Sequence, residues 1–143
     1  MIARPRHSRG ILDTNTVILL PRIEDPALLP EEPLITAATL AELTVGPLVA
    51  MSDEERAARQ AHLQQAEADF EPIPFDANAA RAFGQVAASL RRSGRETSAR
   101  AYDAMIAATA IANELPLYTC NPADFSGIQG LDVVAVPVAP NPE

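Results

Sequence analysis

The chain has 143 residues, of which 48% are hydrophobic and 21% are charged, and this balance is typical of a single folded domain rather than of a disordered chain or a fibre. Its 19 acidic residues outnumber its 11 basic ones, all of them arginine, so the net charge is −8 and an evenly charged surface would repel nucleic acid. Because the sequence contains no lysine, we exclude Schiff-base chemistry and the phosphate-binding P-loop, whose motif requires that residue.

The first part of the chain alternates between apolar runs and turn residues, which predicts short strands and helices in turn. Residues 10–20 are expected to form a buried strand, a tight turn and a brief helix. A connection rich in proline then leads to a second strand at residues 34–36. An apolar helix is predicted over residues 37–50, where Pro47 kinks or ends it because proline lacks a backbone N–H.

The clearest helix in the sequence is predicted over residues 52–70. Ser52 is its expected N-cap, and Glu55 stands three residues later, where it completes a capping box. The many charged residues of this segment indicate that most of the helix surface is in contact with water.

The later part of the chain continues the alternation of strands and helices. Asp76 is predicted to cap a helix that runs to about residue 90, and a turn at residues 93–97 separates it from a helix over residues 99–113. The other predicted elements are short: strands at residues 73–75, 117–119 and 133–136, and one helical turn at residues 122–125.

This order of elements predicts an α/β fold, a three-layer α/β/α sandwich with a mainly parallel central sheet. We expect a single domain over residues 1–143, with a core at about residues 9–137 and a loose tail at 138–143. No uncharged run exceeds ten residues, and the first ten residues lack an apolar segment. We therefore expect no membrane span and no signal peptide, and a cytoplasmic protein.

The usual ligands of soft metals are scarce. Cys120 is the only cysteine, and His7 and His62 are the only histidines. These numbers exclude a disulfide framework and a thiolate zinc cluster, and they make a histidine-based metal site or a Ser-His-Asp triad a poor interpretation.

Four carboxylates are isolated in sequence that is otherwise apolar, unlike the acids that cluster in polar runs. Asp13 is the only charged residue between Arg9 and Arg22, and Glu42 is the only one between Glu32 and Asp53. Asp103 is followed by an apolar run, and Asp124 is the only charged residue between Glu114 and Asp132.

The predicted topology brings these four acids toward one place. Asp13 and Asp124 follow predicted strands, and the carboxyl ends of parallel strands meet at one edge of a sheet, where sites form. Each pair of carboxylates about 4 Å apart would cost about 4 kcal/mol at an effective dielectric constant of ~20. Such repulsion demands a cation, and oxygen ligands alone favour Mg²⁺ or Mn²⁺ over Zn²⁺.

Each of these acids also has a simpler interpretation. Asp13 and Asp124 are in position to cap the short helices that follow them. Asp103 lies where the dipole of its helix favours an acid, and Glu42 has the option of pairing with an arginine. The residues alone do not decide between these interpretations and a metal site.

The sequence carries four motifs in order: ILDTN at 11–15, AEL at 41–43, YDAMIAATA at 102–110 and LYTCNPADF at 117–125. By these motifs the chain resembles the PIN-domain family, and within it the VapC-type toxins of bacterial toxin–antitoxin pairs. The resemblance extends from residue 10 to about residue 137. One departure is Cys120, which stands where such sequences often carry arginine.

The resemblance implies an endoribonuclease in which four acids hold one or two divalent ions. We expect Asp13 and Asp103 to be the primary ligands, Asp124 a further ligand, and Glu42 a ligand or the group that orients the attacking water. The same motifs imply supporting or phosphate-positioning roles for four neutral polar residues: Thr14, Asn15, Thr119 and Asn121.

The resemblance also implies partners. These are an RNA substrate, a small VapB-type antitoxin that holds the toxin inactive, and a second copy of the chain in a homodimer. DNA would be bound only through the antitoxin. The apolar helix at residues 37–50 is a candidate dimer surface, although ordinary core packing explains its composition equally well. A nuclease of RNA processing without an antitoxin, and a protein-binding module without catalysis, are the alternatives.

The arginines are concentrated in two segments, residues 1–22 and 81–103, each with a net charge of +3, while the rest of the chain carries −14. The negative total is therefore not an argument against RNA, because each basic segment includes one of the isolated acids. Four arginines of the second segment are candidates for a rim that contacts phosphates, or else form a solvated turn: Arg91, Arg92, Arg95 and Arg100.

Overall fold

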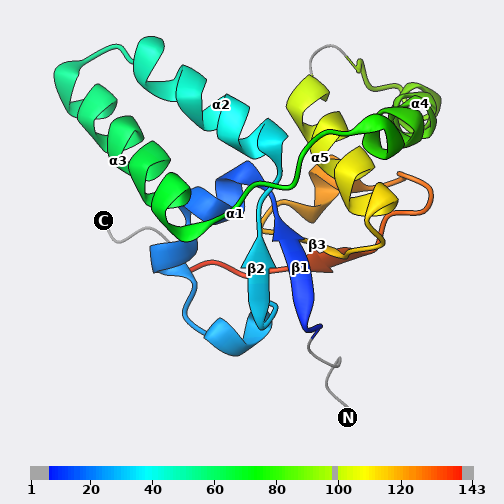
Figure 1. Ribbon diagram of the computed structural model, residues 1–143, viewed down its shortest axis with the longest axis horizontal. Coiled ribbons are helices and arrows are strands. Elements are labelled where there is room, and N and C mark those ends of the chain that lie inside the picture. The colour runs from blue at the N-terminus through cyan, green and yellow to red at the C-terminus, as the bar shows by residue number, and fades with distance from the viewer. Residues whose placement is uncertain (1–6, 98–99, 140–143) are drawn as a thin grey trace.

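The computed structural model describes residues 7–97 and 100–139. Its centre is a sheet of four parallel strands in the order β2-β1-β3-β4 (Figure 1). The strands are β1 (Arg9–Leu12), β2 (Glu32–Leu34), β3 (Leu117–Thr119) and β4 (Val133–Ala135). Because all of them run the same way, their carboxyl ends lie at one edge of the sheet, as the sequence predicts.

Alternate residues of the two central strands face opposite layers. Ile11 and Leu117 belong to one hydrophobic core, and Leu12 and Tyr118 belong to the other. The first core is covered by α4 (Ala77–Arg92) and α5 (Ala101–Ala112), and the second by α1 (Thr14–Ile18) and α3 (Asp53–Asp69). These layers confirm the predicted three-layer α/β/α fold.

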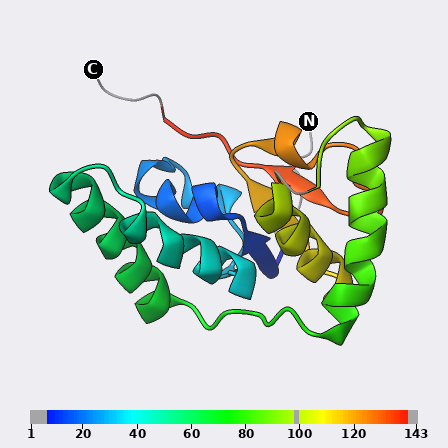
Figure 2. The ribbon, with the colours of Figure 1, turned by 90° about the horizontal axis from the view of Figure 1, so that it is seen from above.

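The helix α2 (Ala37–Leu48) joins the two cores, since its Ala38 packs in the first and its Leu43 in the second. It packs against α3, and the pair projects on one side of the sheet, while α4 and α5 lie on the other (Figures 1 and 2). Pro47 lies in the last turn of α2, one residue before its end, which agrees with the expectation that proline ends this helix.

Two predicted strands differ from the structure. The second strand occupies Glu32–Leu34 rather than residues 34–36; it is an edge strand, where the polar Glu32 and the ring of Pro33 are tolerated. The strand predicted at residues 73–75 is wrong, because only Ile73 forms a bridge, with Thr36. Proline residues on both sides of Ile73 lack the N–H groups that would extend the pairing.

The two predicted N-caps are confirmed, but the predicted capping box differs, because the Glu55 carboxylate accepts from the backbone N–H of Met51 (2.9 Å) rather than from that of Ser52. The Ser52 hydroxyl accepts a hydrogen bond from the backbone N–H of Glu55 (3.1 Å), and Asp76 accepts one from Ala79 (3.0 Å). Most residues of α3 are exposed, as expected for a helix rich in charge. The predicted start of the last helix at residue 99 lies outside the described residues, within which α5 begins at Ala101.

Residues 140–143 of the predicted loose tail lie outside the described residues. Its residue Ala139 is held, because the Arg22 guanidinium donates to the Ala139 carbonyl oxygen (2.5 Å) and the Ala139 N–H donates to the Arg22 carbonyl oxygen (3.2 Å). No helix in the described part of the chain is both long enough and apolar enough to cross a membrane.

Candidate active site

Asp13 is the most buried of the four isolated acids, with 3% of its surface exposed. It follows β1 directly and caps α1, since its Oδ1 accepts hydrogen bonds from the backbone N–H (3.2 Å) and the hydroxyl of Thr16. Its Oδ2 accepts a third hydrogen bond from the Thr119 hydroxyl at the end of β3 (2.9 Å). The cap expected as an alternative is therefore real, and it fixes this carboxylate where the two strands end.

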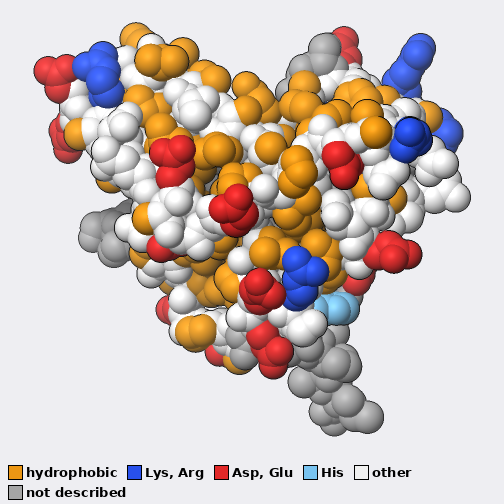
Figure 3. Space-filling model, in the orientation of Figure 1, with side chains coloured by type: hydrophobic (Ala, Val, Ile, Leu, Met, Phe, Trp, Pro, Cys, Tyr) orange, Lys and Arg blue, Asp and Glu red, His pale blue; other side chains and the backbone are white. Residues whose placement is uncertain are grey.

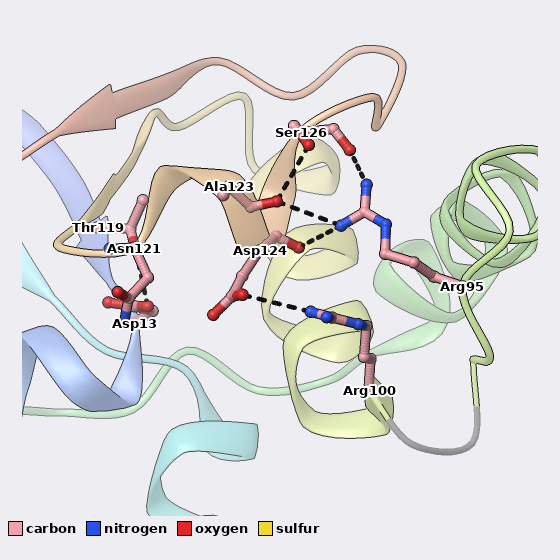
Figure 4. A network of polar contacts seen from close by, with 8 residues as sticks. All are labelled: Asp13, Arg95, Arg100, Thr119, Asn121, Ala123, Asp124 and Ser126. Carbon is pink, nitrogen blue, oxygen red and sulfur yellow. Dashed lines mark hydrogen bonds and ion pairs between the residues drawn. The ribbon is translucent and has the colours of Figure 1, made fainter.

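A chain of hydroxyl groups ties this carboxylate to the loop after β3. The backbone N–H of Asn121 donates to the Thr119 hydroxyl oxygen (2.9 Å), and that of Cys120 donates to the Thr16 hydroxyl oxygen (3.0 Å). Figure 4 shows Asp13, Thr119 and Asn121 together on one side of the site. Thr119, one of the predicted polar residues, thus contacts Asp13 directly, and so does Thr16, which the sequence motifs do not indicate.

Asp124 lies opposite, in the short 3-10 helix η4 (Pro122–Phe125). Its side chain is 39% exposed, and its Oδ1 lies 3.4 Å from Nη1 of Arg100 in an ion pair (Figure 4). Asn121 occupies the cap position of η4 while Asp124 lies inside the helix, so the alternative in which Asp124 is a helix cap is wrong.

Asp103 lies in the first turn of α5, where the sequence places it, and the other three acids are near enough to affect its ionisation. Burial is the largest cause that raises the pKa of Asp103, and with the negative charges of Asp124, Glu42 and Asp13, in that order, it brings the value to about 6. Arg100 acts in the opposite direction. Burial is also the main cause that raises the pKa of Asp13, to which the charge of Asp124 adds.

Glu42 completes the cluster from α2. Its Oε1 is buried and has no hydrogen-bond partner within the described residues, where Glu42 also forms no ion pair. The alternative in which an arginine neutralises this acid is therefore not supported. Glu42 lines a cavity of about 360 Å³ together with Thr14, Asn15, Tyr102 and residues of α3.

The chemistry of this donor set fits a hard divalent cation. The charged groups that converge are carboxylates, one of which has an unpartnered buried oxygen, and their repulsion is what a cation would relieve. Within residues 7–97 and 100–139, no three His, Cys, Asp or Glu side chains are arranged to hold a metal ion directly. Mg²⁺ commonly keeps several waters and uses one or two carboxylates, so a Mg²⁺ site does not require three direct protein ligands.

The other predicted residues have different hydrogen-bond partners. The Thr14 hydroxyl donates to that of Thr39 (3.1 Å) rather than to Asp13, and Asn15 is exposed beside the cavity. Arg91 and Arg92 are exposed at the end of α4, and Arg92 donates to the Ser89 hydroxyl (3.3 Å). Arg95 and Arg100 instead contact η4, so the four arginines do not share one set of contacts.

Known proteins resemble this chain in both sequence and fold. The family model described as the PIN domain matches residues 11–130, which is most of the chain. The chain belongs to the PIN-domain family. Its members of the VapC type include Ribonuclease VapC5 of Mycobacterium tuberculosis, to which this PIN domain is 39% identical over 129 residues, 89% of this chain and 93% of the relative.

Solved structures agree with that assignment. The crystal structure of VapBC-5 from Mycobacterium tuberculosis, a member of the VapBC family of toxin–antitoxin systems, matches with a TM-score of 0.76 and 37% identity, over 90% of this chain and 99% of that one. A DNA-bound VapBC from Salmonella typhimurium matches with a TM-score of 0.69 and 28% identity, over 87% and 96%. This PIN domain is therefore of the VapC type, and ribonucleases of that type generally depend on metal.

Proposed function

We propose that this protein is a divalent-metal-dependent endoribonuclease and the toxin of a VapBC-type toxin–antitoxin pair. The observation that supports the activity most directly is that Asp124, Glu42 and Asp13 all lie near enough to Asp103 to raise its pKa, while a buried oxygen of Glu42 has no hydrogen-bond partner within the described residues. The likeness to Ribonuclease VapC5 gives RNA as the polymer that is cleaved.

In this proposal the four acids hold one or two Mg²⁺ or Mn²⁺ ions. A bound ion of this kind supplies an activated water and neutralises charge on the scissile phosphate. Asp13 is fixed by its three hydrogen bonds and serves as the primary ligand with Asp103. Asp124 is a further ligand, and Glu42 holds the ion or orients the water from the opposite side.

The neutral polar residues act on these ligands and on the substrate. The Thr119 hydroxyl donates to Asp13 and so keeps that carboxylate turned toward the site. Asn121 follows it in the loop after β3, where it is available to a phosphate, and Asn15 is exposed on the rim of the cavity beside Glu42. The Thr14 hydroxyl joins α1 to Thr39 of α2, and Asn15 and Glu42 line the same cavity.

The partners follow from the related structures, which are toxin–antitoxin complexes, one of them bound to DNA. We propose a VapB-type antitoxin as the inhibitor, with DNA contacted through that antitoxin, and a homodimer in the cytoplasm. The apolar tip between α2 and α3 is a surface for such contacts. Its Leu48, Val49 and Met51 side chains are 84%, 59% and 91% exposed, and hydrophobic atoms are visible at this end of the molecule in Figure 3.

The test is RNA cleavage by the purified chain with and without Mg²⁺. We expect cleavage that excess EDTA abolishes and added Mg²⁺ restores, and growth arrest when the chain is expressed without its antitoxin. Asp13→Asn and Asp103→Asn should each reduce cleavage by at least about 100-fold, because changes outside the ligand set alone cost ~10–100-fold in metal sites. Full cleavage in EDTA, or full activity of both variants, would show that the proposal is wrong.

A further inference from the structure

The connection between α4 and α5 reaches across to η4, the helix that carries Asp124. Arg95 lies in this connection, and its guanidinium group donates to three backbone carbonyl oxygens. Nη1 donates to those of Asp124 (2.8 Å) and Ala123 (3.4 Å), and Nη2 donates to that of Ser126. Figure 4 shows the guanidinium directed at this backbone from the side opposite Asp13.

These hydrogen bonds satisfy backbone carbonyl groups at the end of η4 that have no partner within the helix. The last carbonyl groups of any helix have no partner within it, and the planar fork of arginine presents several donors at once. The turn after η4 passes close by, since a Cβ atom on Gly127 would lie 3.7 Å from Nη2 of Arg95. At its other end η4 has no side-chain cap, because Asn121 makes no capping hydrogen bond.

The other anchor of η4 is Phe125, which is 1% exposed in the first core. The backbone that carries Asp124 is therefore held by the Phe125 side chain in the core and by the Arg95 guanidinium group. Arg95 contacts no carboxylate among the described hydrogen bonds and ion pairs, whereas Arg100 pairs with the Asp124 carboxylate itself.

We propose that Arg95 is a positioning residue that holds the backbone of η4 so that the Asp124 carboxylate faces the other three acids and receives the metal ion. This inference rests on the proposed metal-dependent nuclease, and it gives Arg95 a role different from contact with a substrate phosphate. Arg95 acts through geometry, while Arg100, from the same connection, acts on the acids through its charge.

The two roles predict opposite changes in metal affinity. Removing a positive charge close to an acid site raises its affinity for a cation, so Arg100→Gln should bind Mg²⁺ several-fold more tightly. Removing the support of η4 allows Asp124 to turn away, so Arg95→Gln should bind Mg²⁺ about tenfold more weakly despite the lost charge, as with other residues that support a ligand. A pure charge effect of Arg95 would have the opposite sign.

The experiment is calorimetric titration of the metal-free full chain with MgCl₂. Arg95→Lys, which keeps the charge but not the fork, should lie between wild type and Arg95→Gln. Arg81→Gln is the matched control, because Arg81 is exposed on α4 and, among the described residues, donates only to the Asn78 side chain (2.8 Å). We expect this control to bind Mg²⁺ as wild type does.

RNA cleavage supplies a second measurement. A positioning role predicts that the defect of Arg95→Gln shrinks as Mg²⁺ is raised, with the KM for RNA unchanged. A phosphate contact predicts a higher KM at every Mg²⁺ concentration, which would overturn the inference. If Arg95→Gln does not fold by circular dichroism, the comparison of Arg95→Lys with wild type decides.

The two proposals fail in different ways. Mg²⁺ binding by Arg95→Gln and Arg95→Lys equal to or tighter than that of wild type would overturn the role of Arg95 and leave the nuclease proposal standing. A wild type that neither binds Mg²⁺ nor requires it for cleavage would overturn the proposed function itself.

Discussion

The two sides of the acid site are built differently. Asp13 is buried and is held by hydroxyl and N–H donors from its own helix and from the end of β3. Asp124 is 39% exposed, and arginines of the connection between α4 and α5 hold it, one through the carboxylate and one through the backbone. One carboxylate is thus fixed by neutral groups inside the fold, and the other by cations at its surface.

Because of this difference, we expect the two sides to affect different properties, the stability of the fold on one side and the affinity for metal on the other. The donors around Asp13 are needed whenever the protein is folded, because a buried carboxylate without hydrogen bonds is costly. Under the proposed metal-binding role, the arginines around Asp124 instead determine how readily the site accepts another cation. Changes on the Asp13 side should therefore affect folding and catalysis together, and changes on the Asp124 side should affect mainly metal binding.

The largest expected effect on stability comes from Thr16→Val, which keeps the shape of the side chain but removes its hydroxyl. Asp13 loses a donor and the Cys120 N–H loses its acceptor, so the free energy of unfolding should fall by about 1–3 kcal/mol, and Mg²⁺ affinity should fall with it.

Chemical denaturation with Thr44→Val as the control measures this effect. Thr44 is exposed, and its hydroxyl donates to the Ala41 carbonyl oxygen of the same helix (2.6 Å), so its loss should change stability by less than about 0.5 kcal/mol. Equal effects of the two variants would mean that Asp13 does not depend on this hydroxyl.

A smaller effect of opposite sign is expected for Asp103→Asn in the metal-free protein. The pKa of Asp103 is raised to about 6, so the folded state binds a proton more tightly than the unfolded state does. Unfolding free energy therefore falls as pH rises from about 4 to 6, and above that range the ionised carboxylate destabilises the fold by up to about 1–2 kcal/mol after allowance for solvent screening.

Melting temperatures across this pH range check the sign. Asp103→Asn should melt a few degrees above wild type at neutral pH, with the difference vanishing near pH 4, and added Mg²⁺ should stabilise wild type more than the variant. Glu71→Gln, which removes an exposed acid, should show none of this. A large drop for metal-free Asp103→Asn would instead indicate a structural ion pair.

The smallest functional effect is expected far from both sides of the site. Ser52→Ala removes the cap of α3 and should lower the free energy of unfolding by about 1 kcal/mol, while Mg²⁺ affinity and RNA cleavage stay as in wild type. A loss of Mg²⁺ affinity in Ser52→Ala would mean that metal binding depends on the stability of the whole fold. The contrast between the Asp13 side and the Asp124 side would then not hold.

The sequence predicts most of the fold because local signals and topology agree. Apolar runs between turn residues place β1, β3, β4 and the long helices, and Ser52 and Asp76 mark two helix starts. The errors fall where pairing depends on distant neighbours: β2 is an edge strand whose register is set by β1, and Ile73 pairs alone because of its flanking prolines.

The sequence predicts the acids of the candidate site, but it predicts fewer of the residues that contact them. Isolated carboxylates in apolar sequence are conspicuous, since burial of a charge needs a reason. The signal for Thr16 was present as well, three residues after the capping Asp13, where a hydroxyl reaches the cap. No local pattern indicated that Arg95 would reach the backbone of η4, 28 to 31 residues along the chain.

Sequence alone therefore determined the class of fold, and it predicted the four acids and a hard cation, because these follow from residue types and their spacing. Only the tertiary structure decided how each acid is held: Asp13 by hydroxyl groups, Glu42 with an oxygen left unpartnered, and Asp124 between Arg95 and Arg100. The physical reason is that a buried charge takes whichever partner the packing of distant elements brings within hydrogen-bonding distance.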